Sequence, residues 1–172
     1  MSVVVAIIST VLGSVACVPE GTERTDTACT SQTFDLNNHA EPLGSSKALI
    51  QAFDDAADRK LDVTTMAETA GRANWSFGWD RVFYLGPAMT DEYLKSVSAA
   101  DLRLVCFLGL PQRSSNSDLR APHATVFMAD GKPVQAVWWK AQDPSLSLGP
   151  HGFVQPDTPI RYDPESGTMR AD

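Results

Sequence analysis

Residues 124–139, ATVFMADGKPVQAVWW, decide the fold of this chain. Two apolar runs flank Asp130-Gly131, and an Asp-Gly pair between such runs is the strongest short-range signal of a β-hairpin. Because Trp138 and Trp139 are adjacent, a regular strand must point their side chains to opposite faces of the sheet. The stretch therefore predicts two antiparallel strands against which the rest of the chain packs.

Two helices are predicted upstream of the hairpin. Ser45 or Ser46 can cap the first, a long helix. Its apolar side chains recur at helical spacing and form one face; they are Leu49, Phe53, Ala56, Ala57 and Leu61. On the opposite face, Asp55 and Arg59 stand four residues apart, where they can form a weak ion pair. Thr90 can cap the second, short helix, DEYLKSVSA, which carries acidic residues in its first turn.

Two more strands are predicted, one between the two helices and one between the short helix and the hairpin. Residues 79–85 are aromatic and β-branched, and Gly86-Pro87 ends the run. Residues 102–110 form an almost continuous apolar run, which predicts a central strand. Residues 64–73 are polar and small, which indicates a loop or a frayed second helix. This order predicts an α+β fold, an antiparallel sheet of about four strands with one long and one short helix packed on one face.

The N-terminal part of the chain indicates export. Residues 2–18 contain an apolar run of about 15 residues, shorter than the roughly 20 that a membrane-spanning helix needs and typical of a secretory signal. Small residues precede Cys17, as in a bacterial lipobox, where cleavage leaves a lipidated cysteine at the new N-terminus. Plain secretion and a retained short anchor remain open alternatives. The predicted divisions are a signal or lipobox-like segment (1–17), a flexible tether (18–43), the α+β domain (44–140) and an irregular tail (141–172).

Composition supports these divisions. Residues 18–43 contain few large apolar side chains, too few to offset the entropy of ordering them, although Phe34 and Leu36 can dock on the domain. The tail is rich in Pro and Gly turns, and a short edge strand is expected near Phe153 and Val154. The net charge is -7 and the 14 basic residues are scattered, which argues against a nucleic-acid partner or a basic membrane-binding face.

Three cysteines are present. If Cys17 carries lipid, Cys29 and Cys106 remain, and in an oxidising compartment they can form a disulfide that pins the tether to the core. Alternatively, Cys106 is a small buried side chain and Cys29 is free. No CxxC motif is present, so the sequence supports neither a thioredoxin-like nor a zinc site.

The sequence carries no recognisable catalytic motif. It has no GxSxG, SxxK, HExxH or Gly-rich phosphate loop. His39, His123 and His151 lie in three separate irregular stretches without ligand spacing, and Asp54 and Asp58 share a helix face that is expected to be solvated. We therefore predict no catalytic residue, no metal site and no cofactor.

Aromatic residues are the candidate partner-binding group. One indole of the Trp138-Trp139 pair must face away from the helix-covered side unless the tail, with Phe153, Val154 and Ile160, covers it. An exposed indole of this kind would suit a peptide, a glycan or a partner protein. The candidate partner-binding residues are Arg72, Trp75, Trp79, Trp138 and Trp139.

Part of the chain resembles a group of small uncharacterised bacterial exported proteins and lipoproteins. The resemblance is carried by WDRVFYLGP at 79–87, by Thr90 opening a short helix, and by VFMADGKPVQAVWW at 126–139. It covers about 90 residues, from Ser46 to Lys140. It implies an α+β fold and an exported location, and it implies no activity.

The sequence therefore favours an exported protein, lipid-anchored at the cell envelope, that acts without catalysis as a binding or inhibitor-like module. Its expected partner is a protein, a peptide or a glycan at the envelope, and the membrane holds it through the N-terminus. One alternative is a hydrolase that uses His123 or His151 with a nearby carboxylate. Another is an immunity or exclusion protein.

Overall fold

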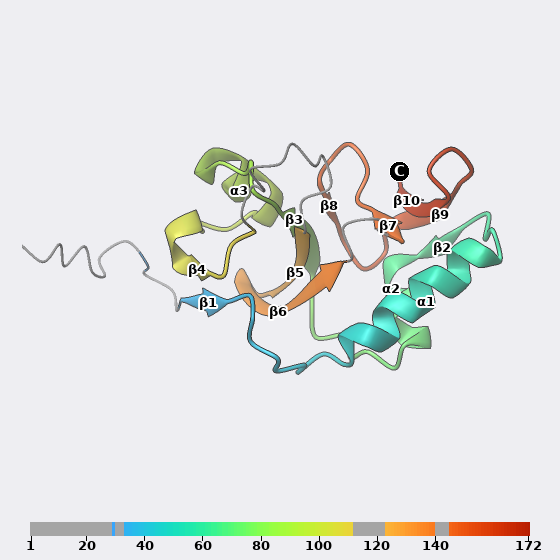
Figure 1. Cartoon of the computed structure of the whole chain (residues 1–172), viewed down its shortest axis with the longest axis horizontal. Helices are drawn as coiled ribbons and strands as arrows, with labels where there is room; N and C mark the ends of the chain where they lie inside the picture. Colours follow the sequence, from blue (N-terminus) through green and yellow to red (C-terminus); the bar gives the residue numbers. More distant parts are fainter. Residues whose placement is uncertain (1–28, 30–32, 112–122, 140–144) are drawn as a thin grey trace, which may run out of the picture.

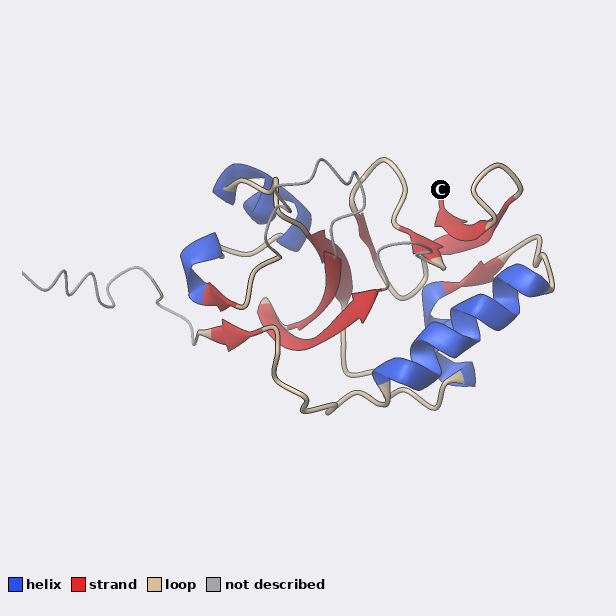
Figure 2. Ribbon diagram, viewed as in Figure 1, coloured by secondary structure: helices blue, strands red, loops and turns tan. Residues whose placement is uncertain are grey.

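The computed structural model describes residues 29, 33–111, 123–139 and 145–172. Within these residues the fold is α+β, with three α-helices and three sheets of two to four strands (Figure 1, Figure 2). The predicted leader (1–17) with Cys17 lies outside the described residues, as does most of the predicted tether. Among the helices of the described part, none combines the length and the hydropathy that a membrane crossing requires.

The central sheet contains the predicted hairpin. β5 (His123–Ala129) and β6 (Lys132–Trp139) pair antiparallel around Asp130 and Gly131, which have φ of 50° and 72°, the positive values that a tight two-residue turn needs. β3 (Arg81–Leu85) pairs with β5, and β8 (Phe153–Val154) adds to the other side of β3. The resulting order is β6-β5-β3-β8. The hairpin and the short edge strand near Phe153 are thus confirmed.

Both faces of this sheet are buried, each in its own core. In β3, Val82 belongs to one core and Phe83 to the other. The α1 core includes α1 (Ser46–Asp58) and α2 (Met66–Arg72); its members include Leu49, Phe53, Met66, Val82, Phe127, Trp139, Ile160 and Met169. The α3 core includes α3 (Asp91–Ser98); its members include Leu36, Phe83, Leu94, Val97, Phe107, Val126 and Met128. The expectation that the helices pack on one face is therefore wrong, because a sheet that is apolar on both faces needs a cover on each.

Side-chain caps fix the helix starts. Ser45 accepts the backbone N–H of Ala48 at the start of α1, and Thr90 accepts that of Tyr93 at the start of α3, as the sequence predicts. In α2, Thr65 and Glu68 form a capping box. This reciprocal cap explains why a helix forms in a stretch that reads as a loop or a frayed helix.

The expected central strand at 102–110 is wrong. A 3-10 helix, η1 (Leu104–Cys106), precedes the short strand β4 (Phe107–Leu108). β4 pairs in parallel with β1 (Phe34–Asp35) and not with the central sheet. Val105 and Leu108 are 62% and 53% exposed, so the apolar run is not buried on both faces as a central strand would be.

Residues 33–43 belong to the packed body, although the sequence places them in the tether. β1 lies within this segment, and Leu36 and Leu43 are buried. The body therefore begins before the predicted boundary at residue 44. Leu36 enters the α3 core and Leu43 the α1 core, so this segment contributes to both.

The described part of the C-terminal tail is not irregular but forms most of a second sheet. Its order is β2-β9-β10-β7, built from β2 (Thr64–Thr65), β9 (Pro159–Asp163), β10 (Thr168–Ala171) and β7 (Leu146–Ser147). Ile160 of β9 and Met169 of β10 are fully buried in the α1 core. Figure 1 shows this sheet beside α1 and α2, where it completes the cover of the first face.

Candidate binding surfaces

Three of the five candidate partner-binding residues are buried. Trp75, Trp79 and Trp139 are 3%, 4% and 3% exposed and belong to the α1 core. The Trp139 ring lies 5.9 Å from that of Phe53, and its Nε1 donates to Thr125 Oγ1 at 2.9 Å. These indoles cannot contact a partner in this fold, so their assignment to a binding surface is corrected.

Trp75 and Trp79 both pack against Phe127, with ring centroids 4.7 and 5.4 Å away. Trp75 Nε1 donates to the Ser45 carbonyl at 2.8 Å, at the start of α1. Its ring lies so close to Gly44, which has φ of 143°, that a Cβ there would come within 2.6 Å of Trp75 Cδ1. Trp75 therefore holds the entry to α1 and is structural.

Trp138 is half-buried and lines an open pocket of about 450 Å³. We call it the Trp138 pocket; it is lined by Leu36, Asn37, Asn38, His39, Ala40, Glu41, Ser46, Ala136 and Trp138. Trp138 Nε1 donates to the Leu36 carbonyl at 2.8 Å, and the ring packs against the α3 core. On this face of the hairpin the segment 36–41 lies beside Trp138. The tail residues Val154 and Ile160 instead bury the face that carries Trp139.

Internal hydrogen bonds hold the polar wall of the Trp138 pocket. Glu41 Oε1 accepts the backbone N–H of Ser46 at 2.7 Å, and Asn38 Oδ1 accepts that of Ala40 at 3.0 Å. The Asn37 amide rests against Gly109, where a Cβ would come within 2.2 Å of Asn37 Nδ2. In the part of the chain that the structure describes, the Asn38 amide nitrogen and the His39 ring make no hydrogen bond. The pocket thus offers an indole, an oriented carboxylate and polar groups that are still available.

Arg72 lines a second, separate depression between α1 and α2. This α1–α2 groove has a volume of about 400 Å³ and is lined by Ala48, Gln51, Ala52, Asp55, Ala56, Arg59, Arg72, Ala73 and Asn74. The expected Asp55–Arg59 ion pair is not among those of the described residues; Asp55 instead accepts from Gln51 Nε2 at 2.9 Å. Arg72 and Trp138 therefore belong to different surfaces.

Asp54 and Asp58 lie in a third depression, of about 420 Å³, with hydroxyl groups from the C-terminal segment. Ser145 Oγ donates to the Asp54 carboxylate, which anchors this segment on α1. Among the described residues, no group of three or more His, Cys, Asp or Glu side chains is placed to hold a metal ion. The arrangement thus ties the second sheet to α1.

The histidines do not come together. His39 is exposed in the wall of the Trp138 pocket. The His123 ring packs edge-on to Tyr84, 5.0 Å away, and the His151 ring lies 6.3 Å from that of Phe153. Tyr84 packs with the α1 core and Phe153 with the α3 core, so the two histidines contact residues on opposite sides of the central sheet. Burial raises the pKa of Tyr84 to about 12, and its hydroxyl donates to the Leu146 carbonyl.

A disulfide joins Cys29 to Cys106, with 5.6 Å between the two Cα atoms. Cys106 is buried in η1, so the bond attaches the N-terminal segment to the body beside β1 and β4. The pairing closes a loop that spans 77 residues. Of the two arrangements that the sequence leaves open for these cysteines, the structure has the disulfide.

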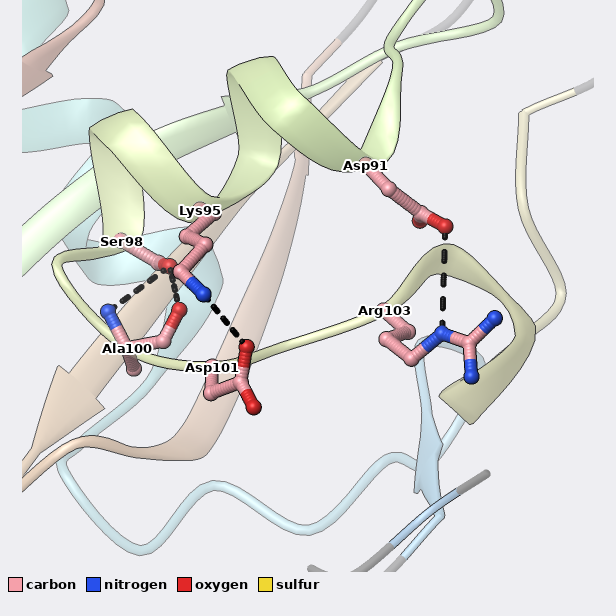
Figure 3. A network of polar contacts seen from close by, with 6 residues as sticks. All are labelled: Asp91, Lys95, Ser98, Ala100, Asp101 and Arg103. Atoms are coloured by element: carbon pink, nitrogen blue, oxygen red, sulfur yellow. Dashed lines mark hydrogen bonds and ion pairs between the residues drawn. The ribbon is translucent and has the colours of Figure 1, made fainter. Parts of the chain in front are cut away.

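Polar contacts place η1 relative to α3 (Figure 3). Asp91 Oδ1 accepts the backbone N–H of Leu104 at 2.7 Å, and its other oxygen lies 4.0 Å from Arg103 Nε. Lys95 Nζ contacts Asp101 Oδ1 at 2.9 Å, which lowers the pKa of Asp101 and raises that of Lys95. Since both side chains of the Lys95 pair are exposed, this pair contributes little to stability. The partly buried hydrogen bond from the Leu104 N–H to Asp91 joins η1 to the start of α3.

No protein-family model matches the chain, and neither a curated protein nor a solved structure matches it. The resemblance to small exported proteins therefore stays an expectation from the sequence. In the part of the chain that the structure describes, the Trp138 pocket, the α1–α2 groove and the disulfide are the features that bear on function.

Proposed function

We propose that the protein is an exported binding module of the bacterial cell envelope, tethered by lipid at Cys17, and that its ligand is a neutral glycan bound in the Trp138 pocket. The observation that carries the proposal is the half-buried Trp138 indole, which lies in an open pocket with polar walls. The other three tryptophans, Trp75, Trp79 and Trp139, are buried in the α1 core, so Trp138 is the one indole that a ligand can contact.

The chemistry of the pocket favours a sugar. A sugar ring has an apolar face of C–H groups, which packs on an aromatic ring, and a rim of hydroxyls, which donate to carboxylates and accept from amides. Trp138 supplies the aromatic ring, while Glu41 and Asn38 supply an acceptor and a donor. Glu41 also makes an anionic ligand unfavourable, as does the net charge of -7.

The disulfide supports the location. Disulfides persist in oxidising compartments such as the cell exterior and are rare in a reducing cytosol. The Cys29–Cys106 bond fixes the point where the predicted tether meets the body. It would therefore keep a domain on a lipid tether in one attachment geometry.

Calorimetric titration of the oxidised mature chain with neutral envelope-type oligosaccharides, such as oligomers of N-acetylglucosamine, tests the ligand. We expect saturable binding that Trp138→Ala abolishes and that Trp138→Phe retains in part, because phenylalanine keeps an aromatic face. His151→Ala, a change outside the pocket, is the matched control and should bind as the wild type does. Thermal unfolding of each variant shows whether it is folded. Unchanged binding by a folded Trp138→Ala chain, or no binding by the wild type, would refute the glycan site.

Mass spectrometry of the mature N-terminus tests the location. We expect a diacylglyceryl group on Cys17 and residues 1–16 removed. A chain with intact Met1 in the cytosol would overturn export. A cleaved but unlipidated chain outside the cell would replace the anchor by plain secretion.

A further inference from the structure

We propose that the α1–α2 groove is a docking site for a peptide segment of a partner protein that presents one carboxylate between small apolar side chains. This goes beyond the proposed function, because the groove and the Trp138 pocket share no lining residue. The proposal rests on the floor of the groove and on the charges along it.

Alanine forms the floor. Ala48, Ala52 and Ala56 stand four residues apart along one stripe of α1, and Ala73 closes the groove from the end of α2. Side chains of this size leave room for a peptide to approach the helix, in a volume of about 400 Å³ that holds only a few residues. Small apolar side chains of a ligand fit this floor, and larger ones would not enter.

Two guanidinium groups give the groove its charge selectivity. Arg59 and Arg72 are exposed and take part in none of the ion pairs or side-chain hydrogen bonds of the described residues. The only carboxylate in the lining, Asp55, already accepts from Gln51. The lining holds two cations and one anion, in a chain whose net charge is -7. Glu68 lies outside the lining and interacts electrostatically with Arg72, but its carboxylate is held by hydrogen bonds from Thr64 and Thr65 and forms no salt bridge with Arg72. An incoming carboxylate can therefore bind the guanidinium groups through paired, charge-assisted hydrogen bonds.

Two further residues favour a peptide over a small anion. Asn74, which is exposed and has φ of 56°, places an amide side chain at the lip of the groove, where it can bond to a peptide backbone. Phe77 is 70% exposed and lies beside the last turn of α2, since a Cβ on Gly71 would come within 3.7 Å of Phe77 Cζ. A peptide that fills the groove can extend onto this ring.

Fluorescence anisotropy with two labelled peptides tests the proposal on the full mature chain. One probe is a capped peptide of alanines around a single glutamate, and the other replaces that glutamate by glutamine. We expect the glutamate peptide to bind and the glutamine peptide to bind about tenfold more weakly, the usual effect of losing a charge-assisted bond. Arg59→Ala and Arg72→Ala should each weaken the glutamate peptide by about the same factor.

Two variants make the result specific. Lys132→Ala, in the hairpin, changes the net charge equally but lies outside the groove, and it should bind the peptide as the wild type does. Ala52→Leu should block binding by filling the floor while all charges remain. Equal binding of both peptides, an equal loss in Lys132→Ala and the arginine variants, or no binding of either peptide would overturn the proposal. Arg72→Ala should leave glycan binding unchanged, so this proposal and the Trp138 pocket fail or survive separately.

Discussion

Gln135 accepts the backbone N–H of Leu43 through its side-chain oxygen at 2.9 Å, although 92 residues separate the two in the chain. Its amide nitrogen donates to the Gly44 carbonyl at 2.9 Å and to Ser46 Oγ at 3.2 Å. Gln135 is 2% exposed and lies in β6, an edge strand of the central sheet. One buried amide thus ties this edge to the segment that enters α1.

Replacing Gln135 should destabilise the fold. Gln135→Leu leaves the Leu43 N–H and the Gly44 carbonyl without their side-chain partner, and each unsatisfied buried group costs about 1–3 kcal/mol. We expect the free energy of unfolding in urea to fall by about 3 kcal/mol. Gln51→Leu, the same change at an exposed position of α1, is the control and should change stability little. Equal midpoints for Gln135→Leu and the wild type would show that this amide does not hold the edge.

The disulfide should contribute strongly to stability. Cys29→Ser opens a loop that spans 77 residues, and the chain-entropy model assigns such a loop about 4.5 kcal/mol. Denaturant unfolding of Cys29→Ser, with free Cys106 alkylated after unfolding to confirm the broken bond, measures the loss. If the wild type unfolds at the same denaturant concentration with and without reductant, the bond does not constrain the fold.

The C-terminal segment should be essential for folding. A chain that ends at Lys140 loses β7, β8, β9 and β10, and with them part of the α1 core. We expect this truncated chain to lack the dispersed amide spectrum of a folded protein. Ile160→Ala is a milder test and should lower stability by about 2–5 kcal/mol, as for other large-to-small changes in a core. Glu165→Ala, an exposed change between β9 and β10, should be neutral. A folded truncated chain would show that the second sheet is not required for the rest of the chain to fold.

Tyr84 should make stability fall at high pH. Its pKa is raised from 10.0 to about 12 by burial, so the folded state holds the phenol proton where the unfolded state has already lost it. This contribution is complete below pH 10 and is lost as the pH rises through about 12, a total of about 2–3 kcal/mol. Urea unfolding across this range measures the decline, and Tyr84→Phe should flatten it. An equal decline in Tyr84→Phe would assign the effect to other groups.

Local signals account for the elements that were predicted well. Asp130-Gly131 supplies the positive φ angles of the hairpin turn, and Ser45 and Thr90 supply side-chain caps. The capping box of α2, Thr65 with Glu68, is equally present in the sequence, although the small polar residues of this stretch indicate a loop or a frayed helix. Each of these features depends on neighbours within a few residues, so a single sequence contains the whole signal.

The candidate surfaces depended on long-range contacts. Trp138 and Trp139 face opposite sides of the sheet, as the sequence predicts. Their hydrogen-bond acceptors lie far away in the chain: Trp138 donates to the Leu36 carbonyl, 102 residues away, and Trp139 donates to Thr125 Oγ1, 14 residues away. The alanine stripe of α1 reads as an ordinary helix face until α2 lies beside it. No local pattern states which distant segment covers which face, so the binding residues could not be separated from the core.

Local chemistry alone, then, dictates the hairpin, the helix starts, the apolar face of α1 and the α+β class, because turns, caps and periodicity act over a few residues. The packed structure alone decides that α1 and α3 cover opposite faces, that β7, β9 and β10 join β2 in a second sheet, and that Trp75, Trp79 and Trp139 are buried while Trp138 reaches a pocket. Apolar burial has no direction, so a buried side chain can be covered equally well by several segments. Which segment covers a given side chain is decided only when all the segments pack together.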